Sequence, residues 1–202
     1  MTHATDASAK AVLRLHVRGL RRAFVRDHPE ADWQAGDRAG ELIERLFRGK
    51  KRTGVIALYR ASGSELDPRP LCESLRELGW SLALPICEAL DEAVLFRAWK
   101  PGERLSADVC GIAAPLASAP QVEPDVVVAP LIAFDRQGGR LGQGGGYYDR
   151  TLSELRLKVR PPLFVGLGFS VQEVDHIPVE PHDERLDAIL TEKEYIAVRK
   201  DL

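Results

Sequence analysis

The residues best suited to chemistry lie between positions 140 and 150, in the segment RLGQGGGYYDR. Four of the five residues from 142 to 146 are glycine, and an arginine stands at each end of the segment. Glycines let consecutive backbone N–H groups approach an anion closely, and a helix that begins directly after them adds the positive end of its dipole. Arg140 and Arg150 would add full positive charges. The segment therefore predicts a phosphate site; the alternative is a glycine hinge with a structural purpose only.

The segment fits neither of the two common phosphate-binding motifs. In G-x-G-x-x-G, Gly142 and Gly144 match, but Tyr147 occupies the third glycine position. A Walker P-loop needs Gly-Lys followed by Ser or Thr, whereas the Gly-Lys pair at 49–50 is followed by another lysine. The sequence thus argues against a standard dinucleotide site and a Walker ATPase, while the physical reasons for phosphate binding remain.

A second set of cations lies on a helix that we expect over residues 8–27. Its apolar residues form one stripe, which comprises Leu13, Val17, Leu20 and Phe24. A neighbouring face carries a basic residue at every fourth position, namely Lys10, Arg14, Arg18 and Arg22. Like charges at this spacing repel each other. The basic row is therefore either a solvated face or an arm that reaches an anionic ligand.

The rest of the chain alternates between helical and strand patterns. Helices are expected at 37–47 with a C-cap at Gly49, at 67–78, and from the glycines to 157. Apolar runs typical of buried strands lie at 55–59, 80–85, 93–99, 126–134, 163–169, 186–190 and 195–198. The stretch 111–125, rich in alanine and proline, is expected to be a loop.

This alternation predicts the fold class. Strands that are apolar throughout, between amphipathic helices, are typical of a mostly parallel sheet covered on both faces. We therefore expect a three-layer α/β/α fold in which residues 1–202 form a single domain. Ligands bind such sheets beyond the carboxyl ends of the strands. The loops after 55–59 and 126–134 are the expected walls of a site.

Composition narrows the function classes. The net charge is -2 with 29% charged residues, which argues against broad binding of nucleic acid or membranes. No apolar run approaches the roughly 20 residues of a membrane span, and the N-terminus lacks an apolar signal region. Cys72, Cys87 and Cys110 are odd in number and far apart. We therefore expect neither a disulfide framework nor a zinc site, and a reducing cytoplasm fits best. We also expect a monomer.

The stretch FDRQGGRLGQGGGYYDR (134–150) closely resembles the signature of the 5-formyltetrahydrofolate cyclo-ligases, also called methenyltetrahydrofolate synthetases. Four other segments agree in order: KAVLR (10–14), YRASGSELD (59–67), FRAWKPGERL (96–105) and PHDERLDAILTE (181–192). The resemblance therefore covers nearly the whole chain. It implies a scaffold similar to that of sugar-phosphate isomerases and CoA transferases. Gly145 departs in part from the family pattern, because some members carry lysine there. The positive charge that such a lysine offers to the phosphates must then come from another residue.

The resemblance implies a reaction. Family members convert 5-formyltetrahydrofolate to 5,10-methenyltetrahydrofolate with MgATP and release ADP and phosphate. The formyl oxygen is a poor leaving group, so it is phosphorylated first, and N10 then attacks the carbon and expels phosphate. Phosphoryl transfer depends mainly on positioning and on neutralising charge. Such an enzyme needs cations around the phosphates, a hard metal held by carboxylates and a flat apolar slot for the pterin.

The resemblance also implies residue roles. ATP would be bound by Lys10, Arg14, Arg140, Leu141, Gly142, Gln143, Gly144, Gly145, Gly146, Tyr147 and Tyr148. The folate would be bound by Arg60, Glu65, Gln143, Gly144, Gly145, Gly146 and Tyr147. Arg140 and Tyr147 would be catalytic. Mg²⁺ would be held by Asp149 and Asp183, since magnesium takes one or two carboxylates beside substrate phosphates; His182 is expected to shape the metal loop.

Structural alternatives stay open for several of these residues. Asp149 would equally suit the first turn of a helix, where a negative charge complements the dipole. Asp183 is otherwise a capping or loop aspartate, and Glu65 a loop glutamate that faces water. We expect Tyr147 to contact a ligand. For Tyr148, contact with a ligand and packing in the core are equally open.

Two other classes of protein remain open on the sequence. A sugar-phosphate isomerase or acyl-CoA transferase on a similar scaffold would bind phosphate without ATP. A ligand-sensing domain of the kind attached to sugar-responsive repressors would not be an enzyme, and it would need a helix-turn-helix that the basic N-terminal helix does not offer. Magnesium-dependent ADP release in the presence of 5-formyltetrahydrofolate separates all three.

Overall fold

The computed structural model describes residues 3–48, 53–178, 180 and 183–199. The C-cap expected at Gly49 and the role expected for His182 lie outside these residues. The helices are α1 (His3–Asp27), α2 (Ala31–Asp37), α3 (Ala39–Phe47), α4 (Arg69–Glu77), α5 (Tyr147–Arg156) and the short 3₁₀ turn η1 (Ser170–Gln172).

Among the described residues, seven strands form one sheet in the order β11-β10-β9-β6-β1-β2-β3. In that order their bounds are Tyr195–Ala197, Ala188–Leu190, Leu163–Leu167, Val126–Pro130, Val55–Ala57, Ser81–Ile86 and Leu95–Ala98. The inner strands run parallel, and β11 and β3 close the two edges antiparallel. Two small antiparallel pairs stand apart: β4 (Leu105–Ala107) with β5 (Ala113–Pro115), and β7 (Ala133–Phe134) with β8 (Arg140–Leu141). The predicted mostly parallel sheet is confirmed.

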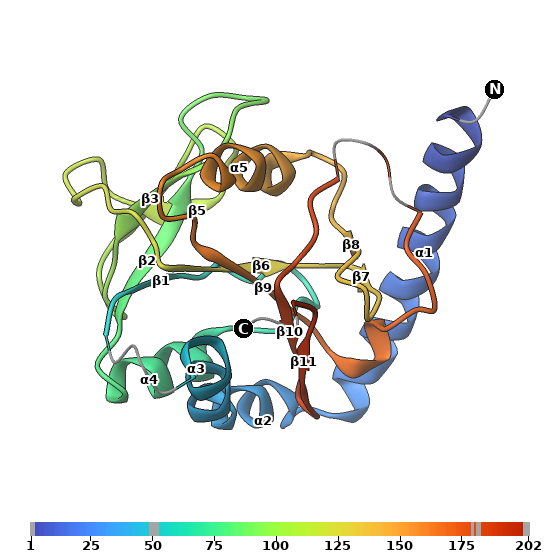
Figure 1. The fold of residues 1–202 in the computed structure, drawn as a ribbon, viewed down its shortest axis with the longest axis horizontal. Coiled ribbons are helices and arrows are strands. Elements are labelled where there is room, and N and C mark those ends of the chain that lie inside the picture. The colour runs from blue at the N-terminus through green and yellow to red at the C-terminus, as the bar shows by residue number, and fades with distance from the viewer. Residues whose placement is uncertain (1–2, 49–52, 179, 181–182, 200–202) are drawn as a thin grey trace.

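Both faces of the sheet are covered (Figure 1). Alternate residues of a strand point to opposite faces of the sheet. In β6, Val126 and Val128 pack in the cluster that includes residues of α2, α3 and α4, whereas Val127 packs with Leu152 of α5. Because both faces are buried, these strands are apolar throughout. The three-layer α/β/α prediction is confirmed.

The long helix α1 lies beside the β7–β8 pair (Figure 1). Val17 is fully buried there, in a cluster with Ile132 and Leu141, and Leu13 packs against it. The first two residues of the expected stripe, Leu13 and Val17, therefore pack onto the segment that leads into the glycine loop. As a consequence, Arg14 and Arg18 of the neighbouring basic row contact that loop, whereas Arg22, further along the helix, is exposed. Phe24 of the stripe packs against the core cluster on the α2–α4 side of the sheet. The prediction is wrong for Leu20, which is 41% exposed.

Apart from smaller shifts at the ends of other elements, local predictions differ from the structure in three places. The strand expected over 126–134 ends at Pro130, because the backbone then leaves β9 and pairs with β8. The stretch 111–125 contains β5, which pairs with β4. The helix expected over 37–47 begins at Ala39 and is preceded by α2. Packing on α4 stabilises α2: a Cβ on Gly36 would lie 2.7 Å from Pro70, so this close approach needs glycine.

Candidate active site

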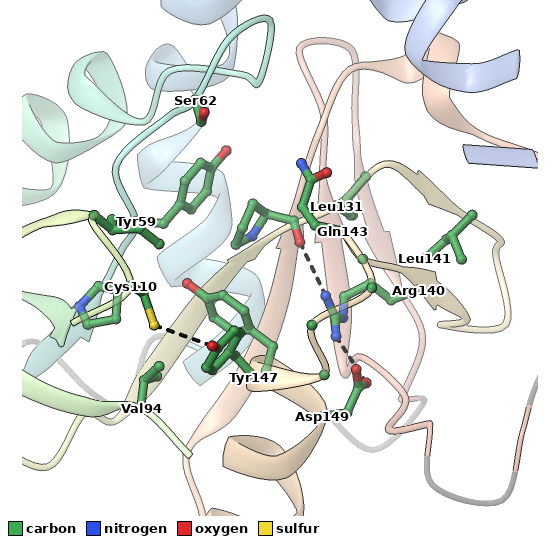
Figure 2. Close-up of a pocket in the computed structure, with 18 of the residues that line it drawn as sticks. Tyr59, Ser62, Val94, Cys110, Leu131, Arg140, Leu141, Gln143, Tyr147 and Asp149 are labelled. Carbon is green, nitrogen blue, oxygen red and sulfur yellow. Dashed lines mark hydrogen bonds and ion pairs between the residues drawn. The ribbon is translucent and has the colours of Figure 1, made fainter. Parts of the chain in front are cut away.

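A cavity of about 560 Å³ lies beyond the carboxyl ends of β1, β2 and β6 (Figure 2). This is the edge at which parallel sheets bind ligands. Its walls come from the loop after β1, the glycine loop between β8 and α5, helix α1 and the turn between β4 and β5. It brings together every described residue to which the resemblance gives a role, namely Lys10, Arg14, Arg60, Glu65, residues 140–149 and Asp183. Arg150, the other arginine expected at the phosphate site, is not among its lining residues and donates to the carbonyl of Gly145 at 2.8 Å.

The glycine loop, residues 142–146, joins a strand to a helix as expected. Gly144 and Gly146 have φ values of 108° and 66°, in the left-handed region that favours glycine. A Cβ on Gly142 would lie 2.8 Å from the Arg140 guanidinium. No side chain among the described residues caps the start of α5. The first N–H groups of this helix can therefore meet an anionic ligand.

Arg140 is the most enclosed cation of the glycine loop. Its side chain is only 3% exposed, and its NH2 atom lies 3.0 Å from Asp149 Oδ1. NH1 donates to the carbonyl of Pro130 at 3.4 Å, and the guanidinium lies 5.7 Å from the ring centre of Tyr148. Its buried Nε has no hydrogen-bond partner among the described residues. A buried guanidinium with a free donor suits an incoming anion.

Lys10 forms a second buried charge cluster on α1. Its Nζ lies 2.6 Å from Glu180 Oε2 and 2.5 Å from Asp183 Oδ2. Burial lowers the pKa of Lys10, but the hydrogen bonds to Asp183 and Glu180 outweigh it and raise the pKa above its ordinary value. Lys10 therefore stays charged inside the cavity wall. Glu180 was missed on the sequence, although it stands three residues before Asp183 in the same segment.

Both candidate magnesium ligands, Asp149 and Asp183, line the cavity, and each contacts a buried cation. The described residues contain no group of three or more His, Cys, Asp or Glu side chains that could hold a metal by itself. Magnesium bound beside phosphates needs only one or two carboxylates. The donor set therefore fits a magnesium ion that arrives with a phosphate ligand and does not fit a metal held by the protein alone.

The opposite wall carries Glu65. Its Oε2 accepts a hydrogen bond from the Ser62 N–H at 2.9 Å, and its Oε1 accepts one from Gln143 Nε2 at 2.7 Å. Arg14 of α1 donates from Nε to the carbonyl of Gly142 at 2.9 Å. Arg60 lines the cavity from an exposed position. The glycine loop is thus bonded to α1 on one side and to the loop after β1 on the other.

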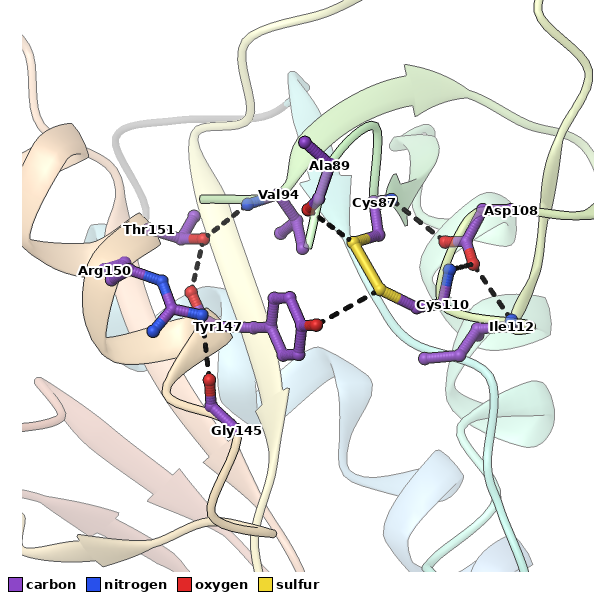
Figure 3. The surroundings of a disulfide bond; sticks show 10 residues. All are labelled: Cys87, Ala89, Val94, Asp108, Cys110, Ile112, Gly145, Tyr147, Arg150 and Thr151. Carbon is purple, nitrogen blue, oxygen red and sulfur yellow. Dashed lines mark hydrogen bonds between the residues drawn. A yellow bond between two sulfur atoms is a disulfide. The ribbon is translucent and has the colours of Figure 1, made fainter. Parts of the chain in front are cut away.

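The two tyrosines differ in their surroundings. The Tyr147 ring lies between Arg150, whose guanidinium is 5.1 Å from the ring centre, and Cys110, whose Sγ is 3.3 Å from the hydroxyl (Figure 3). Tyr148 packs against the core cluster around α5, and burial raises the pKa of its hydroxyl above the ordinary range. Tyr147 therefore presents a polar hydroxyl to the cavity, whereas Tyr148 serves the core and the cavity wall together.

The prediction that the cysteines form no disulfide is wrong. Cys87 and Cys110 form a disulfide across 23 positions, and both residues line the cavity (Figure 3). The bond ties the end of β2 to the turn between β4 and β5. The Asp108 carboxylate fixes that turn by accepting from the N–H groups of Cys87, Cys110 and Ile112, each at 2.9 Å. Neither the odd cysteine count nor the spacing signalled the pair, because only the β4–β5 turn brings them together.

Within the described residues, no helix combines the length and the apolar character that crossing a bilayer requires.

Residues 6–192 match the model of the 5-formyltetrahydrofolate cyclo-ligase family. The chain is 33% identical over 181 residues to a 5-formyltetrahydrofolate cyclo-ligase of Escherichia coli K12, covering 87% of this chain and 96% of the relative. It is 32% identical to one from Haemophilus influenzae, over 80% of this chain and 85% of the relative. An NMR structure of Aquifex aeolicus 5,10-methenyltetrahydrofolate synthetase is similar with a TM-score of 0.72 and 29% identity, over 95% of this chain and 93% of that one. This chain belongs to the 5-formyltetrahydrofolate cyclo-ligase family.

Proposed function

We propose that this protein converts 5-formyltetrahydrofolate to 5,10-methenyltetrahydrofolate and couples the ring closure to ATP. The formyl oxygen attacks the γ-phosphorus, and ADP leaves. N10 of the folate then attacks the activated carbon and loses its proton to the departing phosphate, which carries away the former formyl oxygen. The observation that carries the proposal is that one cavity of about 560 Å³ gathers cations, paired carboxylates and an aromatic wall in a chain of this family.

The phosphate side of the cavity would be formed by α1 and residues 140–148. Lys10 and Arg14 supply charge from α1, and Arg140 supplies a buried guanidinium at the base of the glycine loop. Such preorganised charge stabilises the oxygens of a phosphoryl group during transfer, because little reorganisation is needed when the charge develops. We assign Arg140 a catalytic role for this reason.

Asp149 and Asp183 are the proposed magnesium ligands. When bound, magnesium would supply positive charge beside the phosphates. Arg140 and Lys10 now neutralise these two carboxylates, and a triphosphate in the same cavity would draw on the same two cations. Without a metal ion, the carboxylates would therefore repel the triphosphate. The pairing thus favours a site that binds metal and nucleotide together.

The folate side would be formed by Arg60, Glu65 and Tyr147, together with the glycine loop that both substrates contact. A carboxylate suits the amino-pyrimidinone edge of a pterin, which presents N–H donors. The Tyr147 ring offers a flat surface, and its hydroxyl offers a hydrogen bond near the reacting groups. We propose Tyr147 as the second catalytic residue.

The assay is direct. Purified protein incubated with 5-formyltetrahydrofolate, ATP and magnesium should produce the absorbance of methenyltetrahydrofolate and release one ADP per product. Omission of folate should abolish ADP release. A phosphate-binding isomerase or a sensor domain would not release ADP in a way that depends on folate. A folded protein that yields no product under these conditions contradicts the proposal.

We further propose that residues 1–202 act as one domain, as a monomer, in the cytoplasm. The Cys87–Cys110 bond weighs against that compartment, because cytosolic thiols are kept reduced. Thiol labelling of protein denatured directly from acid-quenched cells separates the two states. Three labelled cysteines per chain support the cytoplasm, and a single labelled cysteine contradicts it.

A further inference from the structure

The side chain of Gln143 connects two walls of the cavity. Its Oε1 accepts a hydrogen bond from Arg18 NH2 at 2.5 Å, and its Nε2 donates to Glu65 Oε1 at 2.7 Å. Arg18 stands on α1, Gln143 in the glycine loop and Glu65 in the loop after β1. Figure 2 shows the Gln143 side chain projecting into the cavity. One amide therefore links the proposed phosphate wall to the proposed folate wall.

The two partners leave this amide only one orientation. A guanidinium can only donate hydrogen bonds, and a carboxylate can only accept them. Arg18 therefore holds the amide oxygen on its own side, and the amide nitrogen faces Glu65. If Arg18 were removed, Gln143 would keep only its hydrogen bond to Glu65, and its side chain would be free to move away from the position in which Arg18 now holds it.

Glu65 is thereby held at both oxygens. The Ser62 N–H bonds Oε2 at 2.9 Å, while Gln143 bonds Oε1. A carboxylate offers about four lone-pair positions, so roughly two stay available. A fixed carboxylate with one free position on each oxygen suits a ligand edge that carries two adjacent N–H donors. The amino-pyrimidinone edge of a folate has this pattern.

The loop that carries Glu65 is also anchored from α1. Arg21, buried at 5% exposure, donates from Nε to Ser64 Oγ at 3.1 Å and from NH1 to the carbonyl of Leu131 at 3.3 Å. The loop is thus held through the Ser64 side chain, independently of Arg18. Loss of Arg18 should change the orientation of side chains at the site and leave the loop in place.

We propose that Arg18 is a positioning residue for the folate: by fixing the amide of Gln143, it sets the orientation in which Glu65 receives the N–H donors of the substrate. The inference rests on the proposed function, because it names a folate as the ligand. Arg18 itself need not touch either substrate. Its influence therefore depends on Gln143, which distinguishes it from a cation that attracts anionic ligands in general.

The experiment is a double-mutant cycle on the full chain, using Arg18→Ala, Gln143→Ala and the double variant. Arg18→Ala should raise the KM for 5-formyltetrahydrofolate roughly tenfold, which corresponds to about 1.4 kcal/mol. The KM for ATP should stay within roughly twofold. In the Gln143→Ala background, Arg18→Ala should change the folate KM by less than roughly twofold, because the residue then has no amide to orient.

Two further variants complete the test. Arg18→Lys keeps a donor at this position and should recover part of the folate affinity. Arg22→Ala removes an exposed arginine one turn further along α1, and its folate KM should equal that of the wild type. Melting temperatures of all variants should agree within a few degrees, since Arg18 is only partly buried.

The outcomes separate this inference from the proposed function. If the wild-type protein forms no methenyl product, the proposed function fails and the inference fails with it. If the wild type is active but Arg18→Ala matches Arg22→Ala, only the inference fails. Equal losses for ATP and folate, or additive effects of the Arg18 and Gln143 changes, would show that Arg18 acts as a general cation and would also overturn it.

Discussion

The buried cations of the cavity each contact a carboxylate that faces the same space. Lys10 contacts Glu180 and Asp183, and Arg140 contacts Asp149. Removing a charge from water costs several kcal/mol unless it is paired, so these contacts hold the cations in place while the cavity contains only water. Under the proposed function, an incoming triphosphate would compete with the carboxylates for the same cations. Under that proposal, binding of the nucleotide changes the ion-pair partners of Lys10 and Arg140.

Asp149→Asn tests this competition. Asparagine keeps an oxygen that can accept from Arg140 but removes the negative charge. We expect a large fall in kcat and a raised magnesium requirement, because the metal loses a charged ligand. The free energy of unfolding should fall by roughly 1–3 kcal/mol, because Arg140 is 3% exposed and loses a charged partner. Turnover is measured across a magnesium titration, and unfolding by denaturant.

Glu77→Gln is the control for that series, because Glu77 is an exposed carboxylate at the end of α4, outside the cavity. Wild-type turnover of Asp149→Asn at low magnesium would show that Asp149 serves only the first turn of α5.

Glu65→Gln tests the folate wall. The amide introduces an NH2 group where Glu65 now accepts from both Ser62 and Gln143, so one of these hydrogen bonds turns into a contact between two donors. We expect the folate KM to rise by a factor that corresponds to about 1–3 kcal/mol, with ATP binding unchanged. Separate titrations with each substrate measure this. Equal weakening of both ligands would mean that Glu65 is wrongly assigned to the folate.

At the scale of elements, the site is where α1 and the glycine loop meet. Four-residue spacing on α1 aligned its basic residues, and burial of Val17 against Leu141 turns that row toward the loop after β8. The four-residue spacing is local and can be read from the sequence. The burial of Val17 against Leu141 depends on tertiary packing. The repulsion within the basic row is offset by partners on other elements, such as Asp183 and the carbonyl of Gly142.

Arg14→Ala tests that junction. Arg14 donates from Nε to the Gly142 carbonyl at 2.9 Å and lines the cavity. Its removal should raise the KM for ATP by a factor that corresponds to roughly 1.5–3 kcal/mol, the typical loss for a charge-assisted hydrogen bond. The melting temperature should change little, because the remaining basic row then repels itself less. A collapsed melting temperature with unchanged ATP affinity would make Arg14 a structural residue. Arg22→Ala is the matched control on the same helix.

The whole molecule shows which features a sequence can predict. The parallel sheet follows from apolar runs such as 126–134, and the glycine loop follows from its composition, so both are local signals. The Cys87–Cys110 bond and the pairing of β4 with β5 are contacts between segments whose own patterns are weak. The hydrogen bonds of the Gln143 side chain to Arg18 and Glu65 join three segments that only the fold brings together. Non-local contacts of this kind are what sequence patterns miss.

The third cysteine gives a prediction for the whole molecule. Cys72 is 3% exposed in the core beneath the sheet, and burial raises the pKa of its thiol from the ordinary 9.0 to about 12. Above pH 9 the thiol ionises in the unfolded chain but stays protonated in the folded protein. The folded state then binds more protons, so the free energy of unfolding begins to fall as the pH nears 9, falls further toward pH 12, and is unaffected by this group well below pH 9.

The expected size is about 1.4 kcal/mol lost between pH 8 and pH 10 through Cys72 alone. Denaturant unfolding at a series of pH values measures it. Cys72→Ala is the variant to compare, because it removes the thiol while Lys10 and Tyr59, whose pKa values are also raised, remain in both proteins. The variant starts from a lower stability, since it leaves a small cavity, but its stability should decline less between pH 8 and pH 10. Parallel pH profiles for the two proteins would show that Cys72 ionises equally easily in both states, which its burial in the core does not allow.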